Sequence, residues 1–187
     1  MQFTPAAARC PRWQRCAVAP QNGADNPAPA FPHFPMSHEQ LLHAIQSLNA
    51  ADAFRPRLDA AQWRNFLQYL TSHDIRSGEL LVKQGELDRT VYFLGEGSLQ
   101  VYATGGTAGA SRSAILRPGA MCGEPGLFAD GMRTANVAAM TTSTVWAMRL
   151  PRFEELCART PAIALEILRA AGSVMALRMR ANMGQIA

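Results

Sequence analysis

The chain carries Gly123-Glu124-Pro125-Gly126-Leu127-Phe128 and, after a four-residue tip, Arg133-Thr134-Ala135. An ionised Glu accepts hydrogen bonds from a hydroxyl, and the guanidinium of an Arg matches a phosphate anion. The two glycines carry no Cβ, so the backbone can approach a ligand closely. Pro125 suits the first position of a helical turn, which would leave the amides of Gly126 and Leu127 pointing at an anion. The stretch therefore predicts a small pocket for a ligand with a hydroxyl and one diffuse negative charge.

The same stretch resembles the phosphate-binding cassette of the cyclic nucleotide-binding domain family, of the catabolite activator protein and protein kinase A regulatory subunit type. The positions that match the signature are Gly123, Glu124, Gly126, Leu127, Arg133, Thr134 and Ala135. The resemblance implies a cyclic mononucleotide, with its ribose 2′-hydroxyl at Glu124 and its phosphate at Arg133. One position departs from the family, because Pro125 replaces an aliphatic residue with a free amide. The alternative is that Glu124 and Arg133 pair with each other, and such an exposed pair contributes only about 0 to 1 kcal/mol.

Outward from this stretch, residues 74–150 consist of short apolar runs separated by glycines. The runs that read as strands are Leu80–Val82, Val91–Leu94, Leu99–Ala103, Ala114–Leu116, Val137–Met140 and Thr144–Leu150. Many short strands without intervening helices favour an antiparallel β-barrel or jelly roll. The family resemblance covers about residues 60–183 and implies the same fold. We therefore predict a mainly β domain with flanking helices, its antiparallel jelly-roll β-barrel lying at about residues 74–150.

Two helices are predicted before the strands. Ser37 and Gln40 can form a capping box, and Asp59 can cap the second helix. Apolar residues recur at helical spacing in both segments: Leu41, Leu42, Ile45 and Leu48 in the first, and Trp63, Phe66, Leu67 and Leu70 in the second. The pair Trp63 and Phe66 could serve as a stacking platform for a base, but at this spacing we interpret it as core.

Residues 151–183 are predicted to be helical, with Pro161 opening a long helix from Ala162 to about Met183. One face suits a partner helix because its apolar residues alternate at three and four, so we expect a homodimer: Leu165, Leu168, Gly172, Met175 and Met179. The opposite face, from Ile163 to Leu177, would pack on the barrel. The family resemblance implies a polar residue from this helix over the base, and the Met-Ala-x-Arg run at 175–178 assigns that role to Asn182. An exposed helix-end Asn is the alternative.

Residues 1–36 are rich in Ala and Pro and are predicted to be a disordered tail before a domain at 37–187. The tail lacks the apolar run of a signal peptide, so we expect no export, and Met36 as the native start is an alternative. No run is long and apolar enough to span a membrane. The four cysteines lack the spacing of a zinc site and the density of a disulfide scaffold. We expect a cytoplasmic protein without metal or cofactor, in which Cys122 is a small buried residue.

The predicted function is a sensor module that binds cyclic AMP or cyclic GMP and signals through its last helix to an unidentified effector protein. One alternative is a transcription regulator that lacks, or is truncated before, its DNA-binding domain; direct DNA binding is not expected, because the sequence ends at Ala187. Another is a structural dimerisation domain with a vestigial pocket, to which Pro125 points. We do not expect an enzyme, since all four His residues precede the predicted strands and no nucleophile-base arrangement is visible.

Overall fold

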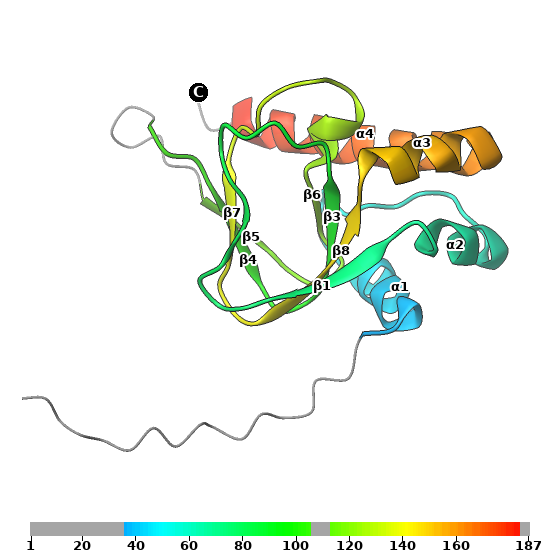
Figure 1. The fold of residues 1–187 in the computed structure, drawn as a ribbon, viewed down its shortest axis with the longest axis horizontal. Coiled ribbons are helices and arrows are strands. Elements are labelled where there is room, and N and C mark those ends of the chain that lie inside the picture. Colours follow the sequence, from blue (N-terminus) through cyan, green and yellow to red (C-terminus); the bar gives the residue numbers. More distant parts are fainter. Residues whose placement is uncertain (1–35, 106–112, 184–187) are drawn as a thin grey trace, which may run out of the picture. The chain divides into compact units, whose positions relative to one another are not determined.

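The structure is a computed structural model that describes residues 36–105 and 113–183 (Figure 1). The predicted tail, residues 1–36, lies outside the described residues except for Met36. The described residues form eight strands with flanking helices, so the mainly β fold class is confirmed.

Eight strands of the described part form two antiparallel four-stranded sheets, with the orders β1-β8-β3-β6 and β2-β7-β4-β5. The strands are β1 (Thr71–Ile75), β2 (Leu80–Val82), β3 (Val91–Glu96), β4 (Leu99–Tyr102), β5 (Ser113–Leu116), β6 (Met121–Cys122), β7 (Asn136–Ala139) and β8 (Ser143–Met148). The pairs β1·β8, β2·β7, β3·β6 and β4·β5 are nested, like a long hairpin that has been rolled up. This nesting is the predicted jelly roll.

Two strands were not predicted, and three predicted strands end one or two residues early, namely β4, β7 and β8. β1 reads Thr-Ser-His-Asp-Ile and buries only Ile75, so it has no apolar alternation, and its pairing with β8 is what makes it a strand. β6 has only two residues. The strand predicted to reach Leu150 ends at Met148, because Leu150 and Pro151 open the next helix. The strands therefore span 71–148 rather than 74–150.

The helices are α1 (His38–Ser47), α2 (Ala60–Leu67), α3 (Leu150–Arg159) and α4 (Pro161–Met183). Both predicted N-caps are confirmed. The Ser37 hydroxyl accepts from the Gln40 amide at 3.2 Å, and the Gln40 side chain accepts from the Ser37 amide at 2.7 Å. Asp59 forms the same reciprocal pair with Gln62. Each box satisfies two amides that would otherwise lack intrahelical partners.

The core has two parts, and α4 closes one of them. The larger part joins the helices to the β3 and β8 sheet, and it contains Trp63 and Phe66, which confirms their interpretation as core. The smaller part fills the roll between the sheets. The apolar face of α4 is buried as predicted from Ile163 to Val174, but Leu177 is 37% exposed. In Figure 1, α4 crosses one end of the roll beside the short helical turn of the cassette.

Candidate functional site

The cassette forms a short 3₁₀ turn, η1 (Glu124–Leu127), with Pro125 in its first turn as predicted. Gly123 precedes it with φ +83°, where a Cβ would lie 2.6 Å from the carbonyl oxygen of Thr90 and 2.7 Å from Nη1 of Arg133. Only glycine fits this position. The Gly126 amide donates to the carbonyl of Gly123 at 3.1 Å, so the prediction that this amide points at an anion is wrong.

Arg133 is fixed from within the roll. Its side chain is only 7% exposed, and its Nη2 donates to Oδ2 of Asp88 at 2.5 Å and to the carbonyl of Thr90 at 2.5 Å. Its Nη1 donates to the carbonyl of Gly123 at 3.3 Å. The Nε of Arg133 is buried without a hydrogen-bond partner among the described residues. The guanidinium therefore has a fixed position and retains N–H donors that make no hydrogen bond to the described residues.

Asp88 is the counter-ion of Arg133, and its second oxygen accepts from the amide and hydroxyl of Thr90. Burial alone would raise the pKa of Asp88, but the hydrogen bonds from Arg133 and Thr90 outweigh burial, so this pKa lies below its ordinary value. The aspartate is therefore ionised at neutral pH and holds the arginine side chain in place.

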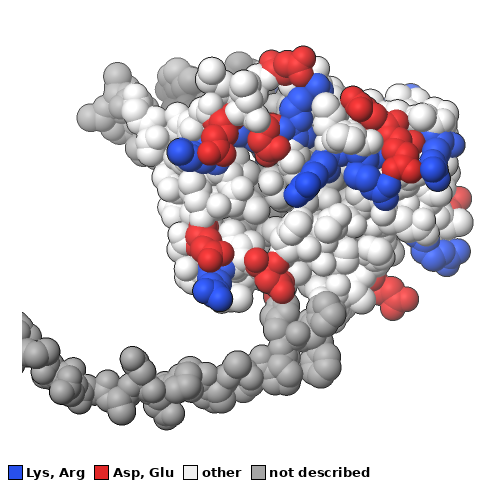
Figure 2. Space-filling model, viewed as in Figure 1, with Lys and Arg blue, Asp and Glu red and all other residues white. Residues whose placement is uncertain are grey.

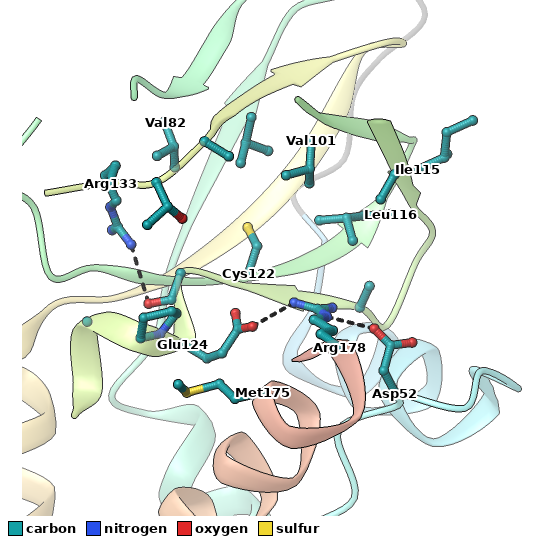
Figure 3. Close-up of a pocket in the computed structure, with 18 of the residues that line it drawn as sticks. Asp52, Val82, Val101, Ile115, Leu116, Cys122, Glu124, Arg133, Met175 and Arg178 are labelled. Carbon is teal, nitrogen blue, oxygen red and sulfur yellow. Dashed lines mark hydrogen bonds and ion pairs between the residues drawn. The ribbon is translucent and has the colours of Figure 1, made fainter. Parts of the chain in front are cut away.

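Glu124 is 5% exposed and does not pair with Arg133. Its Oε1 accepts from Nη1 of Arg178 at 2.9 Å, so the alternative pairing across the cassette is not what the structure contains. Nε of Arg178 also donates to Oδ2 of Asp52 at 2.7 Å, and its Nη2 donates to the carbonyl of Met121 at 3.0 Å. Figure 3 shows Arg178 reaching from α4 to both carboxylates.

Sequence reasoning missed the role of Arg178, although it used the run 175–178 to place Asn182. A signal was present. Ile167, Ala171 and Val174 are buried, and a further step of four residues along α4 reaches Arg178 on the same face. An arginine on a buried helical face requires acidic or carbonyl partners. Helical spacing could therefore have identified this residue, but not its partners.

A cavity of about 1450 Å³ lies between the roll, the cassette and the last turns of α4. Its apolar wall includes Val82, Val101, Leu116, Cys122 and Val137. The predicted site residues that line it are Gly123, Glu124, Gly126, Arg133, Thr134, Ala135 and Asn182. Leu127 does not line it, because its side chain is buried in the larger core. Val82 lines the cavity, whereas the neighbouring strand residues Val91 and Phe93 belong to the larger core.

The remaining polar groups of the cavity differ in exposure. Thr134 and Asn182 are exposed, and both face the cavity from its rim. Burial, assisted by the charge of Glu124, raises the pKa of the Cys122 thiol to about 12, so the thiol stays protonated at neutral pH. This agrees with the prediction of a small buried residue. Within residues 36–105 and 113–183 no group of three His, Cys, Asp or Glu residues could hold a metal ion.

A model of the cyclic nucleotide-binding domain matches residues 72–160, which include all of the roll except Thr71, and the cassette. These residues belong to the cyclic nucleotide-binding domain family. The cyclic nucleotide-binding domain is a regulatory and non-catalytic unit, and the relatives that are kinases are so through other domains. The predicted family and its fold are therefore confirmed.

Relatives of this cyclic nucleotide-binding domain are parts of larger proteins. The chain is 27% identical over 161 residues to the cGMP-dependent protein kinase egl-4 of Caenorhabditis briggsae, which covers 78% of this chain and 21% of the kinase. It is 25% identical to the cAMP-dependent protein kinase regulatory subunit of Blastocladiella emersonii, over 65% of this chain and 30% of that subunit. The chain thus spans about a fifth to a third of the length of these relatives.

Solved structures show the same fold. A cyclic nucleotide-binding domain from Methylobacillus flagellatus KT superposes with a TM-score of 0.68 at 16% identity, over 80% of this chain and 82% of that one. The catabolite activator protein of Thermus thermophilus superposes with a TM-score of 0.61 at 23% identity, over 70% and 59%. No helix in the described parts of the chain has the length and apolar character needed to cross a membrane.

Proposed function

We propose that this domain binds a cyclic mononucleotide, cyclic AMP or cyclic GMP, in the cavity between the cassette and α4. One observation carries the proposal: a buried guanidinium and a buried carboxylate line the same cavity, and each has a separate counter-ion. Because Arg133 and Glu124 do not neutralise each other, both remain available to a ligand. A cyclic nucleotide carries the anion and the hydroxyl that match them.

The phosphate would lie at Arg133. An arginine has five N–H donors, and Asp88, Thr90 and Gly123 occupy three of them, which leaves Nε–H and one hydrogen of Nη1. The hydroxyl of Thr134 and the backbone at Ala135 follow directly on the rim of the cavity. These groups would have to match the phosphate without an amide from residue 125, since proline has none.

The ribose would lie at Glu124, whose Oε1 is occupied by Arg178 and whose second oxygen can accept the 2′-hydroxyl. Gly123 and Gly126 would allow the sugar to approach the backbone, and Leu127 would support the turn from the core. The base would contact the apolar wall at Val82 and Val101, with Asn182 at the end of α4 as the polar group over it. Relatives named for cyclic GMP and for cyclic AMP both match, so both nucleotides need testing.

We also propose that α4 transmits ligand binding to an effector protein and forms a homodimer. Leu165 and Met179 are 49% and 58% exposed on the face that carries Gly172, as expected for a seam that receives a second copy. Charges of both signs are intermixed on the face shown in Figure 2, so this face offers no uniformly basic surface for nucleic acid. Cys122 and Cys157 are free thiols, which fits the reducing environment of the cytoplasm.

Calorimetry and thermal shift with cyclic AMP and cyclic GMP test the proposal. A ligand at a hundred times its Kd stabilises the folded state by about 2.7 kcal/mol, so a rise in Tm is expected. Glu124→Gln keeps the shape of the side chain but removes the charge, and it should weaken binding, whereas Glu155→Gln on the outside of α3 should not. If neither nucleotide gives heat or a shift at millimolar concentration, the pocket is vestigial and the domain is structural.

Light scattering of the Leu165→Glu variant tests the dimer.

A further inference from the structure

The connection between α1 and α2 contributes to the candidate pocket, although it precedes the residues that match the family model. Leu48, Asn49, Ala50 and Asp52 of this connection line the cavity, as does Ser47 at the end of α1. Asp52 also holds Nε of Arg178 at 2.7 Å, and the same guanidinium holds Oε1 of Glu124 at 2.9 Å. Charge-assisted hydrogen bonds therefore link Asp52 to Arg178 and Arg178 to Glu124 in the cassette.

Asp52 is the fixed end of this chain of contacts. Two residues after it, Phe54 is 1% exposed, with its ring 5.2 Å from that of Phe93 between the centroids. The amide of Ala53 donates to the carbonyl of Ala50 at 3.2 Å, which closes a turn around Asp52. The backbone that carries the carboxylate is thus anchored in the larger core.

Arg178 has no such anchor of its own. It lies beyond Val174, the last fully buried residue of α4, and its neighbours Leu177 and Met179 are 37% and 58% exposed. A long side chain near a helix end has many rotamers, and each one fixed costs conformational entropy. Two carboxylates and the carbonyl of Met121 together select one rotamer. If Asp52 is removed, the guanidinium keeps its charge but loses the contact that comes from the core side.

We propose that Asp52 is a positioning residue of the nucleotide pocket, which fixes Arg178 so that Arg178 presents the Glu124 carboxylate to the ribose hydroxyl. The inference rests on the proposed binding of a cyclic mononucleotide. It assigns to the α1–α2 connection a share in ligand affinity. Removal of a negative charge near an anionic ligand removes Coulomb repulsion, which by itself would strengthen binding. A loss of affinity in Asp52→Asn therefore has the opposite sign to the general charge effect.

The test compares two ligands on the unmodified chain, Asp52→Asn and a control. The ligands are the tighter-binding of cyclic AMP and cyclic GMP, and its 2′-deoxy analogue, which lacks the hydroxyl that Glu124 would receive. Asp130→Asn is the control, because Asp130 is not among the residues that line the cavity and its carboxylate pairs with Arg89 at 2.6 Å, away from Arg178. Calorimetry gives the ratio of the two Kd values for each protein.

We expect Asp52→Asn to weaken the ribose ligand about fivefold, the lower end of the usual coupling between linked sites, and to leave the 2′-deoxy ligand unchanged. The preference for the ribose ligand should then shrink in this variant and persist in Asp130→Asn. An equal loss for both ligands, or no loss, overturns the role of Asp52 and leaves the proposed function standing. If the unmodified chain binds neither ligand, the proposed function and this inference fall together.

Hydrogen exchange on the unmodified chain decides the question if Asp52→Asn does not fold. Ligand binding should slow exchange of the Ala53 amide, which closes the turn around Asp52. Unchanged exchange there, with slowed exchange in the cassette, would show that the connection does not respond and would overturn the inference.

Discussion

Arg133 and Arg178 border the same cavity, but the structure fixes them in different ways. Arg133 takes its partners from the roll itself, namely Asp88, Thr90 and the carbonyl of Gly123. Arg178 joins α4 to Asp52 and Glu124, which lie 126 and 54 residues away in sequence. The Arg133 side chain, at the proposed phosphate side, is therefore set once the roll has formed. The Glu124 carboxylate, at the proposed ribose side, is set only when α4 and the α1–α2 connection are both in place.

The largest effect should come from Arg133→Ala. Hydrogen bonds to charged groups contribute about 1.5 to 3 kcal/mol each, so ligand affinity should fall by about thirtyfold or more. Arg169→Ala is the matched control, since that arginine pairs with Glu166 on the exposed side of α4. Calorimetry measures the ligand affinity of both variants. Binding that survives in Arg133→Ala would mean that the phosphate does not lie on the roll side.

Gly123→Ala tests how far the cassette backbone fixes Arg133. The positive φ and the close approach to Arg133 and Thr90 should lower the free energy of unfolding by about 1 to 3 kcal/mol. Gly131→Ala is the control, because a Cβ there meets nothing within 4 Å. Denaturant unfolding gives both values, and equal stability of the two variants would contradict the geometry.

Arg178→Lys tests the other side of the comparison. An ammonium keeps the charge but lacks the planar fork that meets Asp52, Glu124 and the carbonyl of Met121 together. Ligand affinity should fall about fivefold, less than in Arg133→Ala. Arg180→Lys, on the exposed side of α4, should bind as the unmodified chain does. A larger loss at Arg178 than at Arg133 would reverse the ranking of the two sides.

The smallest effect concerns acid pH and the Asp88 carboxylate. Because the pKa of Asp88 is lower in the folded chain than in the unfolded chain, its ionised form favours folding. This contribution is present above the ordinary aspartate pKa of about 3.9 and is lost as pH falls through the lower folded pKa. The difference in Tm between the unmodified chain and Asp88→Asn should therefore shrink below about pH 4. Thermal melts across this range measure it, and a constant difference would contradict the ion pair.

Much of the fold was predictable because its signals are local. Ser37 and Asp59 indicate where helices begin, because each caps a helix through hydrogen bonds to the residue three positions later. The apolar runs of β3 and β8 bury most of their residues and were predicted at close to their bounds. β1 was missed because its residues are mostly polar and exposed, and only the pairing with β8 makes it a strand. Partners distant in the chain leave no local trace in the sequence.

The sequence by itself determined that a helical turn begins at the cassette, since proline suits the first position of such a turn, but it did not determine the direction of the Gly126 amide. It also determined which groups are chemically able to meet a hydroxyl and an anion. Only the tertiary structure decided that Arg133 meets Asp88 and that Glu124 meets Arg178. The reason is physical: many carboxylates could pair with either guanidinium, and the docking of α4 and of the α1–α2 connection on the roll selects which ones come within hydrogen-bonding distance.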